Sequence, residues 1–427
     1  MSQSSGGKKV NREILSWCLY DWAYSSFATI VISAVLPVYY SQVAGVNLEG
    51  NTATVYWGYT TVVALLASVI LAPVMGTVAD YSGIKKRLLL IFAAVGILAT
   101  ALLYFVSTGD WLLASVIFIF GNIGFSMSEV FYNAILPSVA GPKEIDRVSV
   151  KGYALGYLGG GILLALDIGL IEIMSDKILA TRISFITVSI WWTLFTIPFI
   201  LKVKEPGAGK NYKLDANFLT AGFKRLSVTF SELRRYRELF LFLAAFWIYN
   251  DGIGTISKMA TIYGAEIGIS QGVLIGTLLM TQFVGIPFSF AFGRLAGLIG
   301  TKNSIMLGLF VYTIISVAGY FMETALHFFI LAFLVGTVQG GTQALSRSLY
   351  GSMLPREKTA EFFGFYGMSS KFAGIVGPLV FAVVSQLTGT SRLSIFSLII
   401  FFIAGALILN RVDVERGVRA ALDKGLV

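Results

Sequence analysis

The chain has 427 residues, of which 56% are hydrophobic and 13% charged, whereas soluble domains have about 45–50% apolar and about 25% charged residues. So few charged residues cannot cover a soluble surface, and the composition excludes a soluble globular protein. We interpret the net charge of +9 as a consequence of membrane topology, so no nucleic-acid partner is expected.

Cysteine and histidine are too scarce for several kinds of site. The chain has one cysteine, Cys18, and one histidine, His327. One cysteine cannot form an intramolecular disulfide, no Cys/His spacing typical of zinc occurs, and no nucleophile motif accompanies His327. We therefore expect no metal, no cofactor and no enzyme activity.

Apolar stretches of membrane-spanning length recur along the whole chain. About 20 residues are needed to cross about 30 Å of hydrocarbon as a helix, and the stretches predict twelve such helices in an all-α integral membrane protein. They cover residues 14–40, 54–79, 88–107, 111–137, 149–173, 183–203, 239–264, 271–296, 303–322, 327–354, 361–387 and 392–410. The first is too long for a signal peptide and has no evident cleavage site.

The cations are distributed unevenly between the two sides of the predicted membrane. With the N-terminus inside, 25 of the 32 Lys and Arg residues lie on the cytoplasmic side, and only Lys177, Arg182 and Arg392 lie on the other side. Because cytoplasmic loops carry an excess of Lys and Arg, both termini are predicted to be cytoplasmic.

One long connection divides the chain into two sets of six spans, residues 1–203 and 239–427. The connection, 204–238, is strongly basic. Residues 218–238 have apolar and basic side chains at helical spacing, a pattern that fits an amphipathic helix on an anionic membrane surface, and equally a solvated basic loop.

The two sets of spans repeat one another. Residues 76–83 align with 293–300 at an offset of 217, and residues 132–137 align with 350–355 at an offset of 218. A constant offset at two distant places indicates two parallel six-helix repeats, with a substrate path expected along their interface.

Several motifs resemble a known transporter family. The loop after the second span reads Gly76-x-x-x-Asp80-x-x-Gly83-x-Lys85-Lys86-Arg87, which resembles the signature of the major facilitator superfamily. Tyr20-Asp21-Trp22-Ala23, Ser128-Glu129-Val130-Phe131-Tyr132-Asn133, Tyr249-Asn250-Asp251-Gly252 and the stretch from Gln339 to Ser348 resemble a narrower branch. That branch contains the autophagy-linked vacuolar amino-acid effluxers of fungi and their bacterial relatives.

The resemblance implies two pseudo-symmetric six-helix bundles that work by alternating access. It further implies that the solute is a small organic molecule, an amino acid that is exported rather than imported, and that transport is coupled to protons. By the same resemblance, the loop signature latches the cytoplasmic side. The chain departs from the family in two ways: Gly297 replaces Asp80 in the second repeat, and the long loops of fungal members are absent. The second departure favours a compact bacterial type in the inner membrane, and we expect a monomer in contact with membrane lipid.

Two predicted spans carry polar faces. Asn122, Ser126, Glu129 and Asn133 lie within an arc of about 60° on the fourth span, and Gln339, Gln343 and Arg347 within about 80° on the tenth. Glu129 and Arg347 are equivalent in the repeat, so we predict that they form a state-dependent gate pair. A permanent structural pair, or an Arg347 that holds a substrate carboxylate, are the alternatives.

Other ionisable groups within predicted spans are expected to serve binding or coupling. Gly252 and Gly254 predict an interruption of the seventh span beside Asp251. For proton coupling we favour Asp21 and Asp251 over Glu129, and sodium coupling is the rival. The remaining predicted cavity residues are Tyr20, Ser25, Asn250, Lys258 and Lys371, the last as a counter-charge to an acid.

The loop signature also has a mechanical interpretation. Gly76 permits close helix packing and Gly83 a tight turn, while Asp80 is suited to capping a neighbouring helix or pairing with a cation. Two other functions stay open at this point: export of an amphiphile or lipid, and a membrane sensor that no longer transports.

Overall fold

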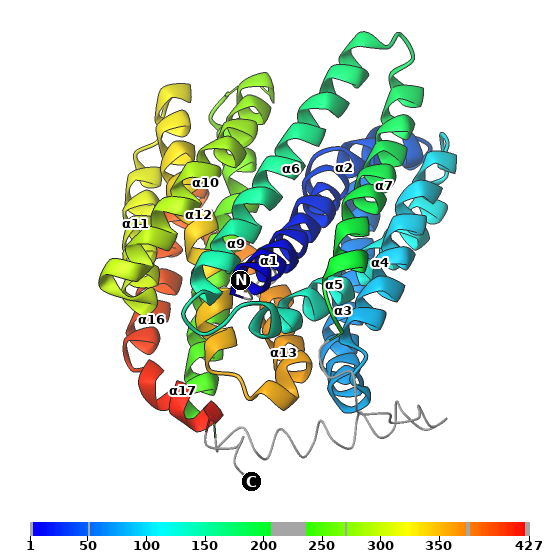
Figure 1. Ribbon diagram of the computed structural model, residues 1–427. Coiled ribbons are helices and arrows are strands. Elements are labelled where there is room, and N and C mark those ends of the chain that lie inside the picture. Colours follow the sequence, from blue (N-terminus) through cyan, green and yellow to red (C-terminus); the bar gives the residue numbers. More distant parts are fainter. Residues whose placement is uncertain (1–2, 50–51, 206–235, 270, 373–375, 423–427) are drawn as a thin grey trace.

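The computed structural model describes residues 3–49, 52–205, 236–269, 271–372 and 376–422. All regular elements in this part of the chain are helices (Figure 1). Residues 206–235 of the predicted amphipathic linker lie outside the described residues.

The first six spans form one bundle. The first span is composed of α1 (Gln3–Ser26), the π-helical segment η1 (Phe27–Ala34), α2 (Leu36–Tyr39) and a second π-helical segment, η2 (Tyr40–Ala44). The next five are α3 (Thr52–Ser82), α4 (Lys85–Leu102) with η3 (Leu103–Phe105), α5 (Trp111–Val139), α6 (Ile145–Ile173) and α7 (Lys177–Lys202). We call this bundle the first half.

The second half contains the other six spans and a short terminal helix. The spans are α9 (Arg237–Glu266), α10 (Gln271–Ile299), α11 (Thr301–Tyr320), α12 (Ala325–Ser352), α13 (Thr359–Phe372) with α14 (Val376–Thr388), and α15 (Ser391–Ser397) with α16 (Ile399–Asn410). A 3-10 turn, η5 (Arg356–Lys358), precedes α13, and α17 (Val414–Leu422) ends the described chain. Twelve helical stretches of the described residues are long and apolar enough to cross a membrane, so the predicted fold class is confirmed.

The predicted interruption of the seventh span is wrong. Helix α9 runs without a break through Gly252 and Gly254. A methyl group at Gly252 would lie 2.9 Å from the Phe402 ring of α16. This glycine therefore allows two helices to approach closely, and the packing outweighs the low helix propensity of glycine.

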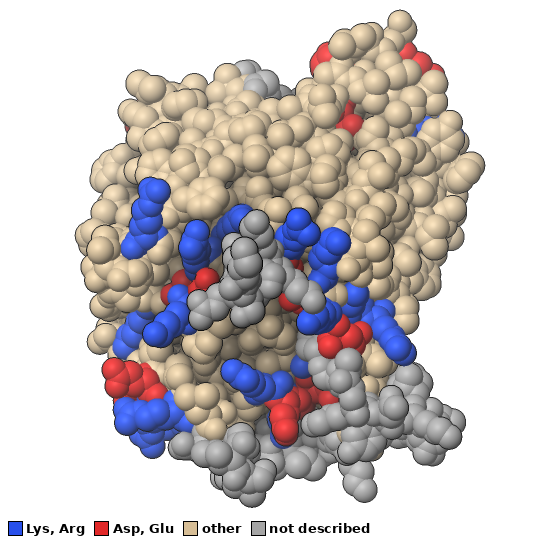
Figure 2. All heavy atoms as spheres, in the orientation of Figure 1, with Lys and Arg blue, Asp and Glu red and all other residues tan. Residues whose placement is uncertain are grey.

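Charged side chains identify one end of the molecule. Lys and Arg gather on the lower part of the face in Figure 2, and the upper part is largely uncharged. We call the end that carries Lys85, Lys143, Lys302 and Arg356 the basic end. The connections α3–α4, α5–α6, α10–α11 and α12–α13 all lie there, as do α17 and the end of α16 (Figure 1).

The two halves pack tightly against each other at the basic end. Helix α3 packs on α13, and α6 packs on α10 and α12. A methyl group at Gly364 of α13 would lie 2.6 Å from the carbonyl oxygen of Ala72, and one at Gly76 of α3 would overlap the backbone of Ala360. Glycines therefore let α3 and α13 touch backbone to backbone, which closes this end of the interface.

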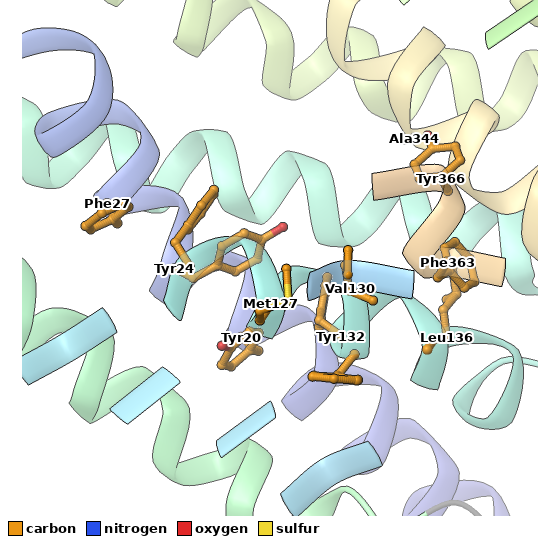
Figure 3. Packing of buried hydrophobic residues seen from close by; sticks show 14 of the residues in the cluster. Tyr20, Tyr24, Phe27, Met127, Val130, Tyr132, Leu136, Ala344, Phe363 and Tyr366 are labelled. Carbon is orange, nitrogen blue, oxygen red and sulfur yellow. The ribbon is translucent and has the colours of Figure 1, made fainter. Parts of the chain in front are cut away.

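Aromatic side chains fill the first half and continue to the second. Tyr20 packs against Tyr24 and Tyr132, with ring centroids 5.3 Å apart in both pairs (Figure 3). Figure 3 also shows Phe363 and Tyr366 of α13 beside α5, where a methyl group at Gly367 would lie 3.1 Å from Val130. The core of the first half is thus continuous with the packed interface.

Candidate functional site

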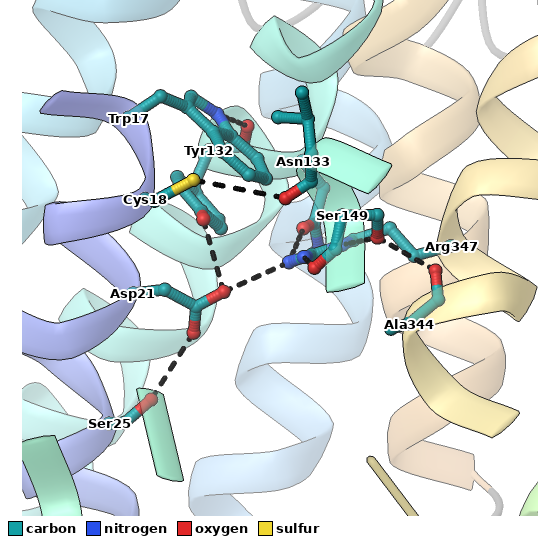
Figure 4. A network of polar contacts seen from close by, with 10 residues as sticks. Trp17, Cys18, Asp21, Ser25, Tyr132, Asn133, Ser149, Ala344 and Arg347 are labelled. Atoms are coloured by element: carbon teal, nitrogen blue, oxygen red, sulfur yellow. Dashed lines mark hydrogen bonds and ion pairs between the residues drawn. The ribbon is translucent and has the colours of Figure 1, made fainter. Parts of the chain in front are cut away.

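The side chain of Arg347 on α12 forms its hydrogen bonds with residues of the first half. This side chain is 1% exposed. Its Nε donates to Ser149 Oγ at 2.8 Å and its Nη2 to the Ser149 carbonyl at 2.7 Å. Its Nη1 donates to Asp21 Oδ2 and to Asn133 Oδ1, both at 3.3 Å (Figure 4). One side chain therefore joins the second half to α1, α5 and α6.

Aromatic rings surround the same guanidinium. Its carbon atom lies 4.3 Å from the ring centroid of Tyr153, 5.1 Å from that of Trp17 and 5.5 Å from that of Tyr132. Rings at these distances attract a cation through their negative faces. We call Trp17, Asp21, Tyr132, Asn133, Ser149 and Tyr153 the arginine socket.

Asp21 is the anion of the socket and is 3% exposed. Its Oδ2 also accepts from Tyr132 Oη at 3.0 Å, and its Oδ1 from Ser25 Oγ at 3.3 Å. A methyl group at Gly152 or Gly156 of α6 would lie 2.9 Å or 2.7 Å from these carboxylate oxygens. Two glycines one turn apart thus make room for a buried carboxylate between α1 and α6.

The structure does not form the predicted pair between Glu129 and Arg347. Glu129 Oε2 instead lies 3.4 Å from Lys371 Nζ of α13. The two halves are closed at the basic end, so a pair that meets on closure should be present. The pair is absent because of how the helices pack. Helix α5 lies against α13 and helix α12 lies against α6. Glu129 therefore reaches α13, and Arg347 reaches α6.

Two cavities lie between the halves. The first has a volume of about 240 Å³ and the second about 110 Å³. The first is lined by Asp21, Tyr24, Ser25, Ala28, Thr29, Ser33, Phe125, Glu129, Tyr153, Gly156, Tyr157, Gln282, Gln339 and Gln343. The second is lined by Glu129, Val130, Asn133, Tyr153, Phe246, Asn250, Gln343, Tyr366, Gly367 and Ser370. Glu129, Tyr153 and Gln343 belong to both, so these three residues mark the junction.

The first cavity leads away from the basic end. It follows the first span from Asp21 to Ser33, and Ser33 is exposed. Ser33 and Thr29 belong to η1, whose wide turns have i to i+5 hydrogen bonds, a feature frequent at functional sites. The interface is thus packed at the basic end and hollow toward the opposite end.

Seven of the fourteen predicted cavity and coupling residues line these cavities, and seven do not. Asp21, Ser25, Glu129, Asn133, Asn250, Gln339 and Gln343 line one or both, and Lys371 reaches Glu129. Tyr20, Asn122 and Ser126 are buried and line neither. The polar face of α5 therefore divides, with its Asn122 end inside the first half and its Glu129 end at the cavities.

Asp251 and Lys258 are not among the residues that line the two cavities. Asp251 is buried, and its Oδ2 accepts from the Gly377 backbone N–H at 2.9 Å. Lys258 is exposed. Asp251 faces the start of α14. That Asp251 and Lys258 offer a solute an acid and a base on one surface stays a prediction.

The loop signature joins the halves at the basic end. Asp80 Oδ2 accepts from the Glu361 backbone N–H at 2.7 Å, and its Oδ1 lies 2.7 Å from Lys85 Nζ. Lys85 also donates to Thr359 Oγ1 at 2.6 Å. Gly83 has a φ of 66°, a conformation that glycine adopts readily. Asp80 and Lys85 of the first half thus hold the start of α13.

Lys86 and Arg87 of the signature serve the first half alone. Lys86 Nζ donates to the carbonyl groups of Ile200 and Val203 at 2.7 and 2.6 Å. Glu205 accepts from the backbone N–H groups of both residues. Burial raises the pKa of Glu205, and the two N–H groups offset part of this effect. The signature therefore divides into two residues that cross between the halves and two that do not.

Sequence analysis missed several residues of the site, five of which take part in the arginine socket or present polar groups to the first cavity. These five are Trp17, Ser149, Tyr153, Tyr157 and Gln282. Tyr153 and Tyr157 lie one turn apart in a glycine-rich segment of α6, and that spacing is a signal that could have indicated a polar face. Among the described residues, no group of three His, Cys, Asp or Glu side chains is arranged to hold a metal ion.

Comparison with known proteins places the chain in a family. The family model for vacuole effluxer Atg22-like proteins matches residues 46–145 and 140–422. An uncharacterized MFS-type transporter, YxiO of Bacillus subtilis, is 41% identical over 96% of both chains. Autophagy-related protein 22 of Yarrowia lipolytica is 25% identical over 85% of this chain and 76% of its own.

Solved structures agree on the fold. The proton:xylose symporter XylE, a major facilitator superfamily protein, matches with a TM-score of 0.75 at 12% identity, over 95% of this chain and 96% of its own. The Bacillus subtilis relative is named an MFS-type transporter, and the fold is that of the superfamily. The chain is therefore a major facilitator transporter, not an enzyme, and belongs to the Atg22-like vacuole effluxer family.

Proposed function

We propose that the protein is a secondary active transporter that exports an amino acid by alternating access, driven by protons. The observation that carries this proposal is the ion pair of Glu129 and Lys371 at the junction of two cavities between the halves. The pair is accessible, because the side chains are 29% and 18% exposed. An anion and a cation within reach of a solute suit a molecule that carries both charges.

The chemistry of this pair fits the backbone of an amino acid. A carboxylate binds an ammonium group, and a lysine ammonium binds a carboxylate, each through charge-assisted hydrogen bonds. A zwitterion inserted between Glu129 and Lys371 replaces their mutual contact with one contact of each sign. Neither charge is then left without a partner, which would be costly within the membrane.

The packing at the basic end supports alternating access. Release of a solute toward that end requires the contacts of α3 with α13 and of α6 with α12 to separate. Arg347 would then leave its socket, since its hydrogen-bond partners belong to the first half. The arginine socket thus acts as a latch that is closed when the cavity leads to the opposite end.

Asp21 supports coupling to protons. It is the only carboxylate bonded to Arg347 among the described residues, and it also lines the first cavity. A proton that arrives through the cavity neutralises Asp21 and removes the charge that retains Arg347. When the latch is open, a proton on Asp21 avoids an unpaired buried charge. Proton binding and opening of the basic end therefore favour each other.

The sequence and the family support a membrane orientation and a direction of transport. The excess of cations supports a cytoplasmic position for the basic end and both termini. The absence from the sequence of the long loops of fungal members supports a bacterial inner membrane. The cavity then leads to the outside. Efflux agrees with the description of the family, and a monomer contains both halves of the proposed path.

Two measurements test this function. The purified protein is heated with amino acids, peptides, nucleosides, sugars and lysolipids, because a ligand at 100 times its Kd stabilises by about 2.7 kcal/mol. We expect amino acids to raise the melting temperature. Flux into proteoliposomes is then measured with a proton gradient and, separately, with a sodium gradient. Stabilisation by lysolipids alone contradicts the amino-acid proposal, and flux driven only by sodium contradicts proton coupling.

A further inference from the structure

Three glutamine side chains form the second-half wall of the first cavity. Gln282 belongs to α10, and Gln339 and Gln343 lie one turn apart on α12. All three are half-buried. No hydrogen bond joins any of them to another residue in the described part of the chain. A carboxamide has two N–H donors and a carbonyl acceptor, so this wall presents amide groups that the protein itself does not use.

The first-half wall presents three hydroxyl groups to the same cavity. They belong to Thr29 of η1 and to Tyr153 and Tyr157 of α6. Within the described residues, none of these hydroxyls has a hydrogen-bond partner in the protein, whereas Ser25 and Ser33 nearby donate to Asp21 and to the Ala28 carbonyl. Each free hydroxyl can donate once and accept twice. Six polar groups with unused hydrogen-bonding capacity thus face one another across the cavity.

Tyr157 is held in place by the other half. A methyl group at Gly340 of α12 would lie 2.5 Å from its ring, and one at Gly285 of α10 would lie 3.3 Å from it. The ring is therefore positioned against the helices that carry the glutamines. This contact keeps the hydroxyl wall and the amide wall in a fixed relation in the present conformation.

The position of the ion pair determines which part of a solute meets these walls. Glu129 lies at the junction of the two cavities and pairs with Lys371. An amino acid whose charged groups bind this pair can direct its side chain into the first cavity. There, an aliphatic side chain would exclude water from the six polar groups and return no hydrogen bond, whereas a carboxamide or hydroxyl side chain would replace that water.

We infer that the transported amino acid has a polar, uncharged side chain with a carboxamide or hydroxyl group, and that Gln282, Gln339 and Gln343 determine this specificity. The inference rests on the proposed function, since it requires the ion pair to bind the ammonium and carboxylate groups. Sites built to form hydrogen bonds reject analogues that lack the polar group more strongly than apolar pockets reject a small change of size.

The test is uptake of radiolabelled L-glutamine and L-leucine by proteoliposomes, measured as kcat/KM. We expect the wild-type protein to prefer glutamine by at least about tenfold. The double variant Gln339→Leu with Gln343→Leu should lose most of this preference and gain leucine transport. Gln386→Leu on α14 is the matched control, since Gln386 is exposed and lines neither cavity, and it should keep the wild-type ratio.

Each outcome separates this inference from the proposed function. Leucine transport by the wild-type protein at the same kcat/KM as glutamine overturns the inference and leaves amino-acid transport in place. A double variant with the wild-type ratio overturns the role of the glutamines. Absence of transport for both amino acids, with the melting temperature unchanged by any amino acid, overturns the proposed function and the inference together.

Discussion

Two equivalent contacts cross between the halves of this protein, and they lie in very different surroundings. Arg347 contacts Tyr153, and Glu129 contacts Lys371. Arg347 follows Glu129 by 218 positions, and Lys371 follows Tyr153 by the same number, so the repeat relates one contact to the other. Arg347 is 1% exposed, whereas Lys371 and Glu129 are 18% and 29% exposed.

The difference indicates a division of tasks within a symmetric scaffold. Arg347 lines neither cavity, and separating its buried ion pair with Asp21 leaves uncompensated charges, which suits a latch that responds to a proton. A pair at a cavity can exchange its partner for a solute at little cost, since partly exposed pairs contribute about 0–1 kcal/mol. The predictions below use this contrast, beginning with the largest effect.

Replacement of Arg347 tests the buried side of the comparison. Arg347→Gln leaves Asp21 without its cation, and we expect the free energy of unfolding to fall by about 3–5 kcal/mol, with transport lost. The measurement is thermal unfolding in detergent together with flux. The double variant Asp21→Asn with Arg347→Gln should recover part of the stability, because no unpaired charge remains. A double variant less stable than Arg347→Gln alone contradicts this account of the socket.

A bulkier residue at the α3–α13 contact tests the closure of the basic end. Gly364→Val places methyl groups against the backbone of Ala72 and Pro73. Overpacking of this kind destabilises the packed structure by about 1–3 kcal/mol. Flux should fall by about tenfold or more. Gly58→Val on α3 is the control, since nothing lies within 4 Å of a methyl group there. Equal flux in the two variants would show that closure does not depend on this contact.

Neutralisation of Glu129 tests the accessible pair. Glu129→Gln removes a charged hydrogen bond to the solute, a loss of about 1.5–3 kcal/mol, and should weaken binding by about 10-fold to 100-fold. Thermal stability without solute should change by less than about 1 kcal/mol. Binding is measured as the solute-dependent shift in melting temperature, with the exposed Glu172→Gln as control. A large loss of stability with unchanged binding would reverse the assigned tasks of the two pairs.

We expect the smallest effect on transport from the loss of contacts that stay within one half. Lys86 donates to Ile200 and Val203 in the first half, and Lys302 donates to Asn410 and Val412 in the second. Because neither lysine crosses between the halves, Lys86→Met or Lys302→Met should lower stability by about 1 kcal/mol and leave kcat/KM unchanged. Flux assays with melting curves check this, and a loss of flux at retained stability argues against it.

Much of the fold was predictable because each span must satisfy its backbone hydrogen bonds within a helix and bury an apolar surface in lipid. Hydropathy alone therefore gives twelve spans. The interruption predicted in α9 was wrong because helix propensity alone does not describe Gly252. This glycine makes room for Phe402, which lies on a helix 150 positions away.

The site was predictable in its residue types but not in its pairings. Helical periodicity places Glu129 and Arg347 on inward faces, but it does not say which helix covers each face. Two residues related by a pseudo-twofold axis meet only when both lie on that axis. Here α13 covers Glu129 and α6 covers Arg347, so the partners Lys371 and Asp21 required the tertiary structure.

The most direct test of the latch is a distance measurement across the basic end. Spin labels are attached at Lys143→Cys in the first half and Arg356→Cys in the second, both exposed positions, in a Cys18→Ala background. In the otherwise wild-type protein we predict one short distance at alkaline pH. On acidification, a second population with a longer distance should appear and increase. After Asp21→Asn, the longer distance should predominate at every pH. An Asp21→Asn variant with the same distances and the same pH dependence as the parent would contradict the claim that the charge of Asp21 holds the halves together.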